Sequence, residues 1–157
     1  MARLLIDTEE MIMALEDHGG PRYFLDVETG EIVWVADPPG REEDDLAERI
    51  EDDPQRYRHI DPIPSSESFN VMAEFVDSLD NPEAQRALAR ALRGSHPFRR
   101  FKDALLSFPA IREKWFRYHA EAFREFVRTW LEEEGIDADL SPLWFERKAQ
   151  ANPDLAS

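Results

Sequence analysis

The amino-acid sequence predicts an α+β fold, with a small N-terminal antiparallel sheet packed on a mainly helical C-terminal half. Residues 23–35 contain two runs rich in β-branched and aromatic residues on either side of Glu28-Thr29-Gly30, which is typical of a β-hairpin. Residues 65–134 instead repeat apolar side chains every three to four positions, as amphipathic helices do. The change in period along the chain therefore separates a β part from an α part.

The N-terminal third carries further signals for short elements. Asp7 is a suitable N-cap for a helix over residues 7–17, which the glycines at 19 and 20 would end. An isolated hairpin is only marginally stable, so residues 56–60, which alternate in character, are a candidate third strand. Leu46 and Ile50 lie four residues apart within the acidic segment 41–53 and predict a short helix that Pro54 ends.

The C-terminal half predicts four helices. The first is capped by Ser65 or Ser66 and runs to residue 79, and the second is capped by Asp80 and ends at residue 93. The third begins near Pro97, with His96 as a candidate cap, and the fourth covers about residues 110–134. The expected buried face of the fourth helix consists of Ile111, Trp115, Tyr118, Ala122, Phe126 and Trp130.

The length of 157 residues suits one domain. We predict a single α+β domain over residues 1–135. Residues 136–157 are predicted to form a C-terminal tail that is partly helical, around residues 143–145, or frayed.

The composition narrows the class of protein. The chain has no cysteine, which excludes a thiol nucleophile and a thiolate metal site and fits a reducing compartment. No wholly apolar run exceeds five residues, the length of 32–36, far short of the ~20 that span a bilayer. The first residues also lack the apolar stretch of a signal peptide. We therefore expect a cytoplasmic protein with no membrane segment.

Charge is distributed unevenly along the chain. The net charge is −15, which disfavours binding to nucleic acid or anionic lipid. Residues 1–83 hold 23 acids and 6 bases, residues 84–130 hold 4 acids and 11 bases, and residues 131–157 hold 7 acids and 2 bases. A strongly negative N-terminal part is thus followed by a positive helical part.

The positive part contains the main candidate binding site, around the segment 98–103. Its two phenylalanines are three residues apart and share a helix face, while the bases project toward other faces, and the helix start offers free backbone N–H groups to an anion. One interpretation is a site for a phosphate, a carboxylate or an acidic partner. The other is that the cations pair with the protein's own acidic half, which the abundance of acids favours. The predicted site residues are Arg93, Arg99, Arg100, Lys102, Asp103 and Phe116.

Aromatic residues give two further hypotheses. Rings interleaved with arginines across residues 98–130 are a mixture that single-stranded nucleic-acid binders use for stacking. Their spacing favours a buried helix face, with Phe116 and Phe123 as the best candidates for exposure. Trp34 is expected to pack the hairpin onto the helices, whereas an exposed indole would mark a partner site, and the hairpin's outer edge is able to accept a strand from another chain.

No motif of a known catalytic or metal chemistry occurs in the sequence. The acids of residues 42–53 lack the spacing and central glycine of a calcium loop, and a solvated face is the favoured interpretation. The four histidines, at 18, 59, 96 and 119, show no metal-ligand spacing. A pair such as Asp103 and His119 meeting in space keeps an enzyme of unidentified class as one alternative. No metal and no cofactor are predicted.

Three separated motifs occur in a familiar order: Leu-Leu-Ile-Asp at 4–7, Phe-Leu-Asp-Val-Glu-Thr-Gly-Glu-Ile-Val-Trp at 24–34, and Phe-Arg-Arg-Phe-Lys-Asp at 98–103 followed by Trp115. Together they resemble an uncharacterised bacterial protein family, number 0158 of the series kept for proteins of unknown function. The likeness covers roughly residues 3–135. It implies a bacterial cytoplasmic protein and brings no activity, cofactor or catalytic residue.

The predicted function is therefore a non-catalytic interaction protein that uses the basic and aromatic stretch 93–117 to bind an unidentified protein partner. Binding of RNA or DNA through the same stretch is the alternative, which the net charge disfavours.

Overall fold

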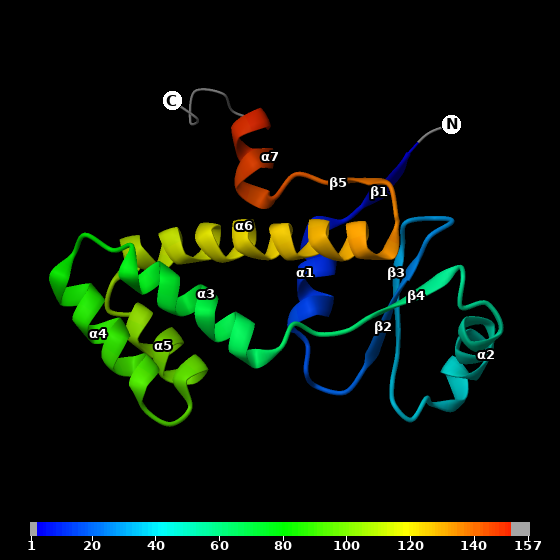
Figure 1. Ribbon diagram of the computed structural model, residues 1–157, viewed down its shortest axis with the longest axis horizontal. Coiled ribbons are helices and arrows are strands. Elements are labelled where there is room, and N and C mark those ends of the chain that lie inside the picture. The colour runs from blue at the N-terminus through cyan, green and yellow to red at the C-terminus, as the bar shows by residue number, and fades with distance from the viewer. Residues whose placement is uncertain (1–2, 152–157) are drawn as a thin grey trace. The chain divides into compact units, whose positions relative to one another are not determined.

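A computed structural model describes residues 3–151 and confirms the α+β fold (Figure 1). The chain divides into two compact units: unit 1 contains Met1–Pro62 and Phe123–Ser157, and unit 2 contains Ile63–Ala122. The long helix α6 (Pro109–Glu134) contributes its first part to unit 2 and its last part to unit 1. A single domain over residues 1–135 with a tail from 136 stays a prediction.

Unit 1 contains the predicted hairpin and its third strand. Strands β2 (Arg22–Asp26), β3 (Ile32–Val35) and β4 (Tyr57–Ile60) form an antiparallel sheet in the order β3-β2-β4. The hairpin turn depends on Gly30, whose φ is +82° and whose added Cβ would lie 2.7 Å from the Leu5 carbonyl oxygen. A side chain at this position would therefore be strained and would collide with backbone.

The acidic segment after the hairpin is helical, as predicted. A short 3-10 helix η1 (Arg41–Glu43) leads into α2 (Asp44–Asp52). Ile50 is buried with Phe24, Val35 and Tyr57 of the sheet, and Leu46 and Val33 pack against this cluster. The two apolar residues that predicted the helix are thus the ones that attach it to the sheet.

Unit 1 also contains a parallel pair of strands that the sequence did not indicate. Helix α1 (Thr8–Glu16), capped by Asp7 as predicted, is preceded by β1 (Leu4–Ile6), which pairs in parallel with β5 (Ala138–Leu140). The Thr8 hydroxyl donates to the Ser141 carbonyl at 2.6 Å, and the Thr8 amide donates to the Ser141 hydroxyl at 3.0 Å. Helix α7 (Trp144–Ala151) follows. The remainder of the predicted tail, residues 152–157, lies outside the described residues.

A buried ion pair stabilises the hairpin of unit 1. The side chain of Asp26 is 6% exposed and accepts hydrogen bonds from Arg56 Nε at 3.1 Å and Nη2 at 3.0 Å. Burial alone would raise the pKa of Asp26, but the hydrogen bonds from Arg56 and from the Glu28 amide, with the charge of Arg56, lower it below its usual value. Asp26 is therefore held as a carboxylate.

Unit 2 contains four helices packed around a tryptophan. They are α3 (Ser65–Asp77), α4 (Pro82–Arg93), α5 (Pro97–Leu105) and the part of α6 up to residue 122. Trp115 of α6 is 7% exposed, and its ring centre lies 4.9 Å from that of Phe101 in α5 and 5.3 Å from that of Phe75 in α3. Edge-to-face contacts of this kind make Trp115 the centre of the unit's core.

The predicted caps of α3 and α4 need correction. The N-cap of α4 is Asn81, whose side chain accepts from the Ala84 amide at 3.1 Å, and not Asp80, because Pro82 occupies the first helical position. Helix α3 begins at Ser65 itself, so Pro64 takes the cap position without a side-chain hydrogen bond.

The buried face of α6 also differs from the prediction. Ile111 and Trp115 are buried as expected, but the later buried residues are Ala120, Phe123, Val127 and Leu131, whereas Tyr118, Ala122, Phe126 and Trp130 are half-buried. The helix contributes to one unit with its first half and to the other with its second half, so no single 3.6-residue stripe describes it.

Candidate functional site

All six side chains that were predicted to form a site are exposed and lie in unit 2. Arg93 is the last residue of α4, and Arg99, Arg100, Lys102 and Asp103 lie on α5. The sixth, Phe116, lies on α6. We refer to Arg93, Arg99, Arg100 and Lys102 as the cationic patch.

The core fixes the direction of the cationic patch. Phe101 is fully buried against Trp115, and Leu105, one turn later, is 2% exposed. Since these residues turn one face of α5 inward, the side chains at 99, 100 and 102 are directed to the other faces of the helix. Of the two phenylalanines expected to share a helix face, Phe101 is buried whereas Phe98 is 37% exposed, and the basic residues at 99, 100 and 102 are exposed.

Arg100 lies close to the C-terminal end of α4. A Cβ added at Gly94, the C-cap of α4, would come within 1.6 Å of Arg100 Nη1, so the guanidinium lies directly against the backbone of Gly94. The C-terminal end of a helix carries a partial negative charge that favours nearby cations. Arg93 and Arg100 therefore have a local structural partner in the α4 dipole.

The start of α5 has the opposite polarity. Arg99 and Arg100 occupy its first turn, which contains no acidic residue, although the positive end of the helix dipole favours anions there. The N-cap residue His96 has a left-handed backbone, φ +52°, and makes no capping hydrogen bond with its side chain, so the prediction that it caps α5 is wrong. Two guanidinium groups thus lie at a helix end that favours negative charge.

The cationic patch has no carboxylate partner within its own unit. Unit 2, all of which the structure describes, holds 9 bases and 8 acids. Within it, none of Arg93, Arg99, Arg100 and Lys102 forms an ion pair with an acid of the unit. Pairing with the acidic N-terminal half stays a prediction.

Two further cations, Arg86 and Arg90, were missed by the sequence reasoning. With Arg93 they lie at positions i, i+4 and i+7 of α4, and all three are exposed. This spacing places them on one helix face, opposite the buried Ala84 and Leu88. The signal was present in the sequence, since residues 84–112 contain seven bases and one acid, Asp103.

Exposed apolar side chains also occur in unit 2. Phe98, at the start of α5, is 37% exposed, Leu106 is 64% exposed, and Phe116 is 41% exposed. The guanidinium carbon of Arg112 lies 4.8 Å from the ring centre of Phe116, a cation–π contact on one helix. The exposure of Phe116 confirms its prediction, while Phe123 is 1% exposed, so its predicted exposure is wrong.

Three features are absent from the described residues. Within unit 2, Asp103 forms no hydrogen bond with His119, whose ring lies 5.3 Å from that of Trp115. Across residues 3–151, no group of three or more His, Cys, Asp or Glu side chains is placed to hold a metal ion. No helix in this part of the chain combines the length and apolar character that a membrane crossing requires.

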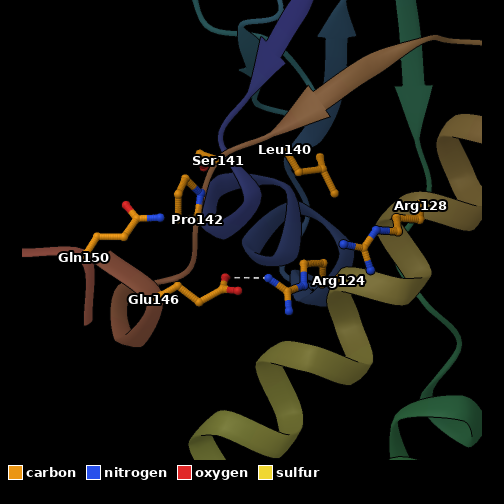
Figure 2. A pocket seen from close by; sticks show the side chains of 7 residues that line it. All are labelled: Arg124, Arg128, Leu140, Ser141, Pro142, Glu146 and Gln150. Carbon is orange, nitrogen blue, oxygen red and sulfur yellow. Dashed lines mark hydrogen bonds and ion pairs between the residues drawn. The ribbon is translucent and has the colours of Figure 1, made fainter. Parts of the chain in front are cut away.

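A small pocket in unit 1 has polar walls (Figure 2). Its volume is about 250 Å³, and it is lined by Arg124, Arg128, Leu140, Ser141, Pro142, Glu146 and Gln150. The Glu146 carboxylate accepts from Arg124 Nη1 at 2.5 Å and from the Leu143 amide at 2.9 Å, and Arg128 pairs with Glu125. The Leu143 amide lowers the pKa of Glu146 most, burial opposes this, and Arg124 adds to it. The charges of this pocket are therefore balanced internally.

Comparisons with known proteins complete the description of the site. A family model described as "Uncharacterised protein family (UPF0158)" matches residues 1–143. The UPF0158 protein PA5073 of Pseudomonas aeruginosa is 34% identical over 137 residues, covering 87% of each chain. No solved structure matches.

Proposed function

The chain belongs to the uncharacterised protein family UPF0158, and from this premise we propose that it is a non-catalytic cytoplasmic interaction protein of bacteria. Its cationic patch binds an acidic surface of a partner protein. The observation that carries the proposal is the position of Arg99 and Arg100 in the first turn of α5, without an acid of their own unit beside them.

Local energetics support this proposal. A cation in the first turn of a helix is destabilising by about 0.3–1 kcal/mol. Arg100 has a favourable neighbour in the C-terminal end of α4 at Gly94, and Lys102 lies in the last turn of α5, where the helix dipole favours a cation, but Arg99 has no such compensation within unit 2. A side chain that opposes the helix dipole, and that gains no stabilising contact in exchange, is expected where binding of a partner requires it.

The surroundings of the patch favour a protein partner. Arginine and aromatic residues are the types that most often dominate binding energy at protein interfaces. Here five exposed arginines of α4 and α5 occur together with the partly exposed Phe98. An acidic partner would also supply the carboxylates that this part of the unit lacks.

Binding of single-stranded RNA or DNA is the second candidate. The exposed rings of Phe98 and Phe116, with arginines nearby, are the residue types of a stacking surface. The net charge of −15 opposes approach to a polyanion, which is why we place this candidate second.

The test is affinity capture from a bacterial lysate, carried out with and without nuclease. The bait is the full chain as wild type, as the patch variant Arg99→Gln/Arg100→Gln/Lys102→Gln, and as a charge-matched control. Arg41→Gln/Arg49→Gln/Lys148→Gln is a suitable control, because it removes three exposed cations of unit 1 that form no ion pair among the residues of that unit between 3 and 151.

The proposal expects a protein that is captured by the wild type and the control, survives nuclease, and is lost from the patch variant at unchanged melting temperature. Loss of capture after nuclease, together with oligonucleotide binding that weakens steeply with salt, would transfer the function to nucleic acid. Equal capture by the patch variant would show that the cationic patch does not bind the partner.

A further inference from the structure

The outer edge of the hairpin is open. Strand β3 is an edge strand of the sheet, and Trp34 at its centre is 54% exposed, so the prediction that this indole packs the hairpin onto helices is wrong. The strand itself reads Ile-Val-Trp-Val and carries no charged residue. Natural edge strands are usually protected by charge, proline or a covering element.

The register shows which backbone groups face outward. The Asp26 amide donates to the Glu31 carbonyl at 2.9 Å, so residues 26 and 31 form a hydrogen-bonded pair. In an antiparallel ladder such pairs alternate, so Val33 and Val35 also face β2 with their backbone groups. The N–H and C=O groups of Ile32 and Trp34 therefore point away from β2, and within residues 3–151 they have no hydrogen-bond partner.

The two faces of β3 differ. Val33 and Val35 face the cluster that Leu46 and Ile50 of α2 complete. Ile32 and Trp34 lie on the opposite face, where Trp34 stands directly across from Tyr23 of β2. A strand added to this edge is thus able to pair with the N–H and C=O groups of Ile32 and Trp34 and to contact the exposed indole of Trp34.

The negative charge around this edge favours a positively charged binding partner. Exposed Glu31 and Asp37 flank β3, and residues 41–53, which include the adjoining helix α2, hold eight acids and two bases. Unit 1 as a whole has 26 acids and 10 bases, a net charge of −16. A second copy of the same edge would bring equal negative charge, whereas a basic segment would be attracted.

We propose that β3 is a docking edge for an extended, basic peptide segment of a partner, which adds a strand beside Ile32 and Trp34. Main-chain hydrogen bonds would provide the pairing, Trp34 would contact an apolar side chain, and the acids of α2 would attract lysines or arginines of the segment. This site is independent of the cationic patch of unit 2, which attracts the opposite charge.

The probe is a synthetic peptide of alternating lysine and valine, seven residues long, added to the full-length protein. Its matched control is the same peptide with alternate backbone nitrogens methylated, which keeps the charge and removes the donors of one edge. Binding is followed by NMR hydrogen exchange of the amides in β3 and by calorimetry. A glutamate–valine peptide provides the charge control.

The expected result is slower exchange at the Ile32 and Trp34 amides, with little change at Val33 and Val35. Methylation of the peptide, or Trp34→Ala, is expected to weaken binding by about tenfold or more, as for an aromatic anchor at an interface. Because the indole is largely exposed, Trp34→Ala leaves the fold intact.

Binding that is insensitive to both changes would overturn the proposal, because it would show simple attraction to the acids of α2. Protection of the same two amides that rises with protein concentration, in the absence of peptide, would replace the basic segment by a second copy. Equal binding of the glutamate–valine peptide would contradict the role of charge.

Discussion

Among the residues of unit 1 that the structure describes, six of the ten basic side chains form ion pairs, for example Arg56 with Asp26 and Arg124 with Glu146. In unit 2, leaving Arg117 aside, none of the other eight bases pairs with an acid of the unit, although eight acids are available. The supply of acids therefore does not explain the difference.

The arrangement of the residues does explain it. Five of the eight acids of unit 2 lie between residues 67 and 83, from α3 to the start of α4, whereas seven of its nine bases lie between residues 86 and 112. Arginine thus has two roles. In unit 1 it forms ion pairs between segments that are distant in the sequence, and in unit 2 it is exposed to solvent. The following predictions test this contrast, from the largest expected effect to the smallest.

Removal of the anchor beneath the cationic patch is expected to have the largest effect. Phe101→Ala removes a fully buried ring beside Trp115 and should destabilise the protein by about 3–5 kcal/mol, the usual cost of such a cavity. Phe98→Ala, at a ring that is 37% exposed, should cost about 1 kcal/mol or less. Urea unfolding of the two variants measures both, and equal losses would contradict the assignment of inner and outer faces to α5.

The buried pair of unit 1 comes next. Asp26→Asn leaves Arg56 with only the exposed Glu28 as an ion-pair partner and should cost roughly 2–3 kcal/mol, less than a fully buried pair because Arg56 is 32% exposed. Asp103→Asn, in unit 2, should change the free energy of unfolding by about 0.5 kcal/mol or less, since an exposed and unpaired carboxylate contributes little. Similar costs for the two variants would contradict the contrast between the units.

Low pH should destabilise unit 1, because three of its carboxyl groups have lowered pKa values. The Tyr23 hydroxyl lowers the pKa of Asp17, and the pKa values of Asp26 and Glu146 are lowered as well. A lowered folded-state pKa stabilises the protein above the unfolded pKa, about 4, and this stability is lost as the pH falls through the folded values. The unfolding free energy should thus fall below about pH 4. In Asp26→Asn this slope should be shallower, and an unchanged slope would contradict the role of Asp26.

The contact between α6 and α7 is expected to have a smaller effect. Glu146→Gln keeps the shape of the side chain but removes the negative charge to which Arg124 and the Leu143 amide donate hydrogen bonds. We therefore expect the free energy of unfolding to fall by about 1 kcal/mol. Faster hydrogen exchange of the α7 amides would locate the loss. A Lys148→Gln control, at an exposed residue that forms no ion pair with the described part of the chain, should show no change.

The sequence was informative wherever a local pattern decides the structure. The hairpin at 23–35, the acidic helix with Leu46 and Ile50, and the inward face of α5 all follow from periods and turn residues close together in the chain. The pairing of β1 with β5 joins residues 4–6 to 138–140, and three-residue strands carry too little period to signal a partner so far away.

The candidate site could be predicted only in part. The exposure of the arginines follows from the position of Phe101, which is a local pattern. Their lack of acidic partners within unit 2 depends on how α3, α4 and α5 pack, and the exposure of Trp34 depends on its place at the sheet edge. Both are properties of the tertiary structure, which a local sequence pattern does not encode.

The most direct test of the contrast is the free energy of unfolding in urea of two variants. We predict that Arg99→Gln/Arg100→Gln/Lys102→Gln lies within about 0.5 kcal/mol of the wild type, because displayed cations contribute little to stability. The single change Arg56→Gln should cost roughly 2–3 kcal/mol, since it leaves the buried carboxylate of Asp26 unpaired. A patch variant that loses as much stability as Arg56→Gln would show that the cations of unit 2 are structural, and would contradict the account.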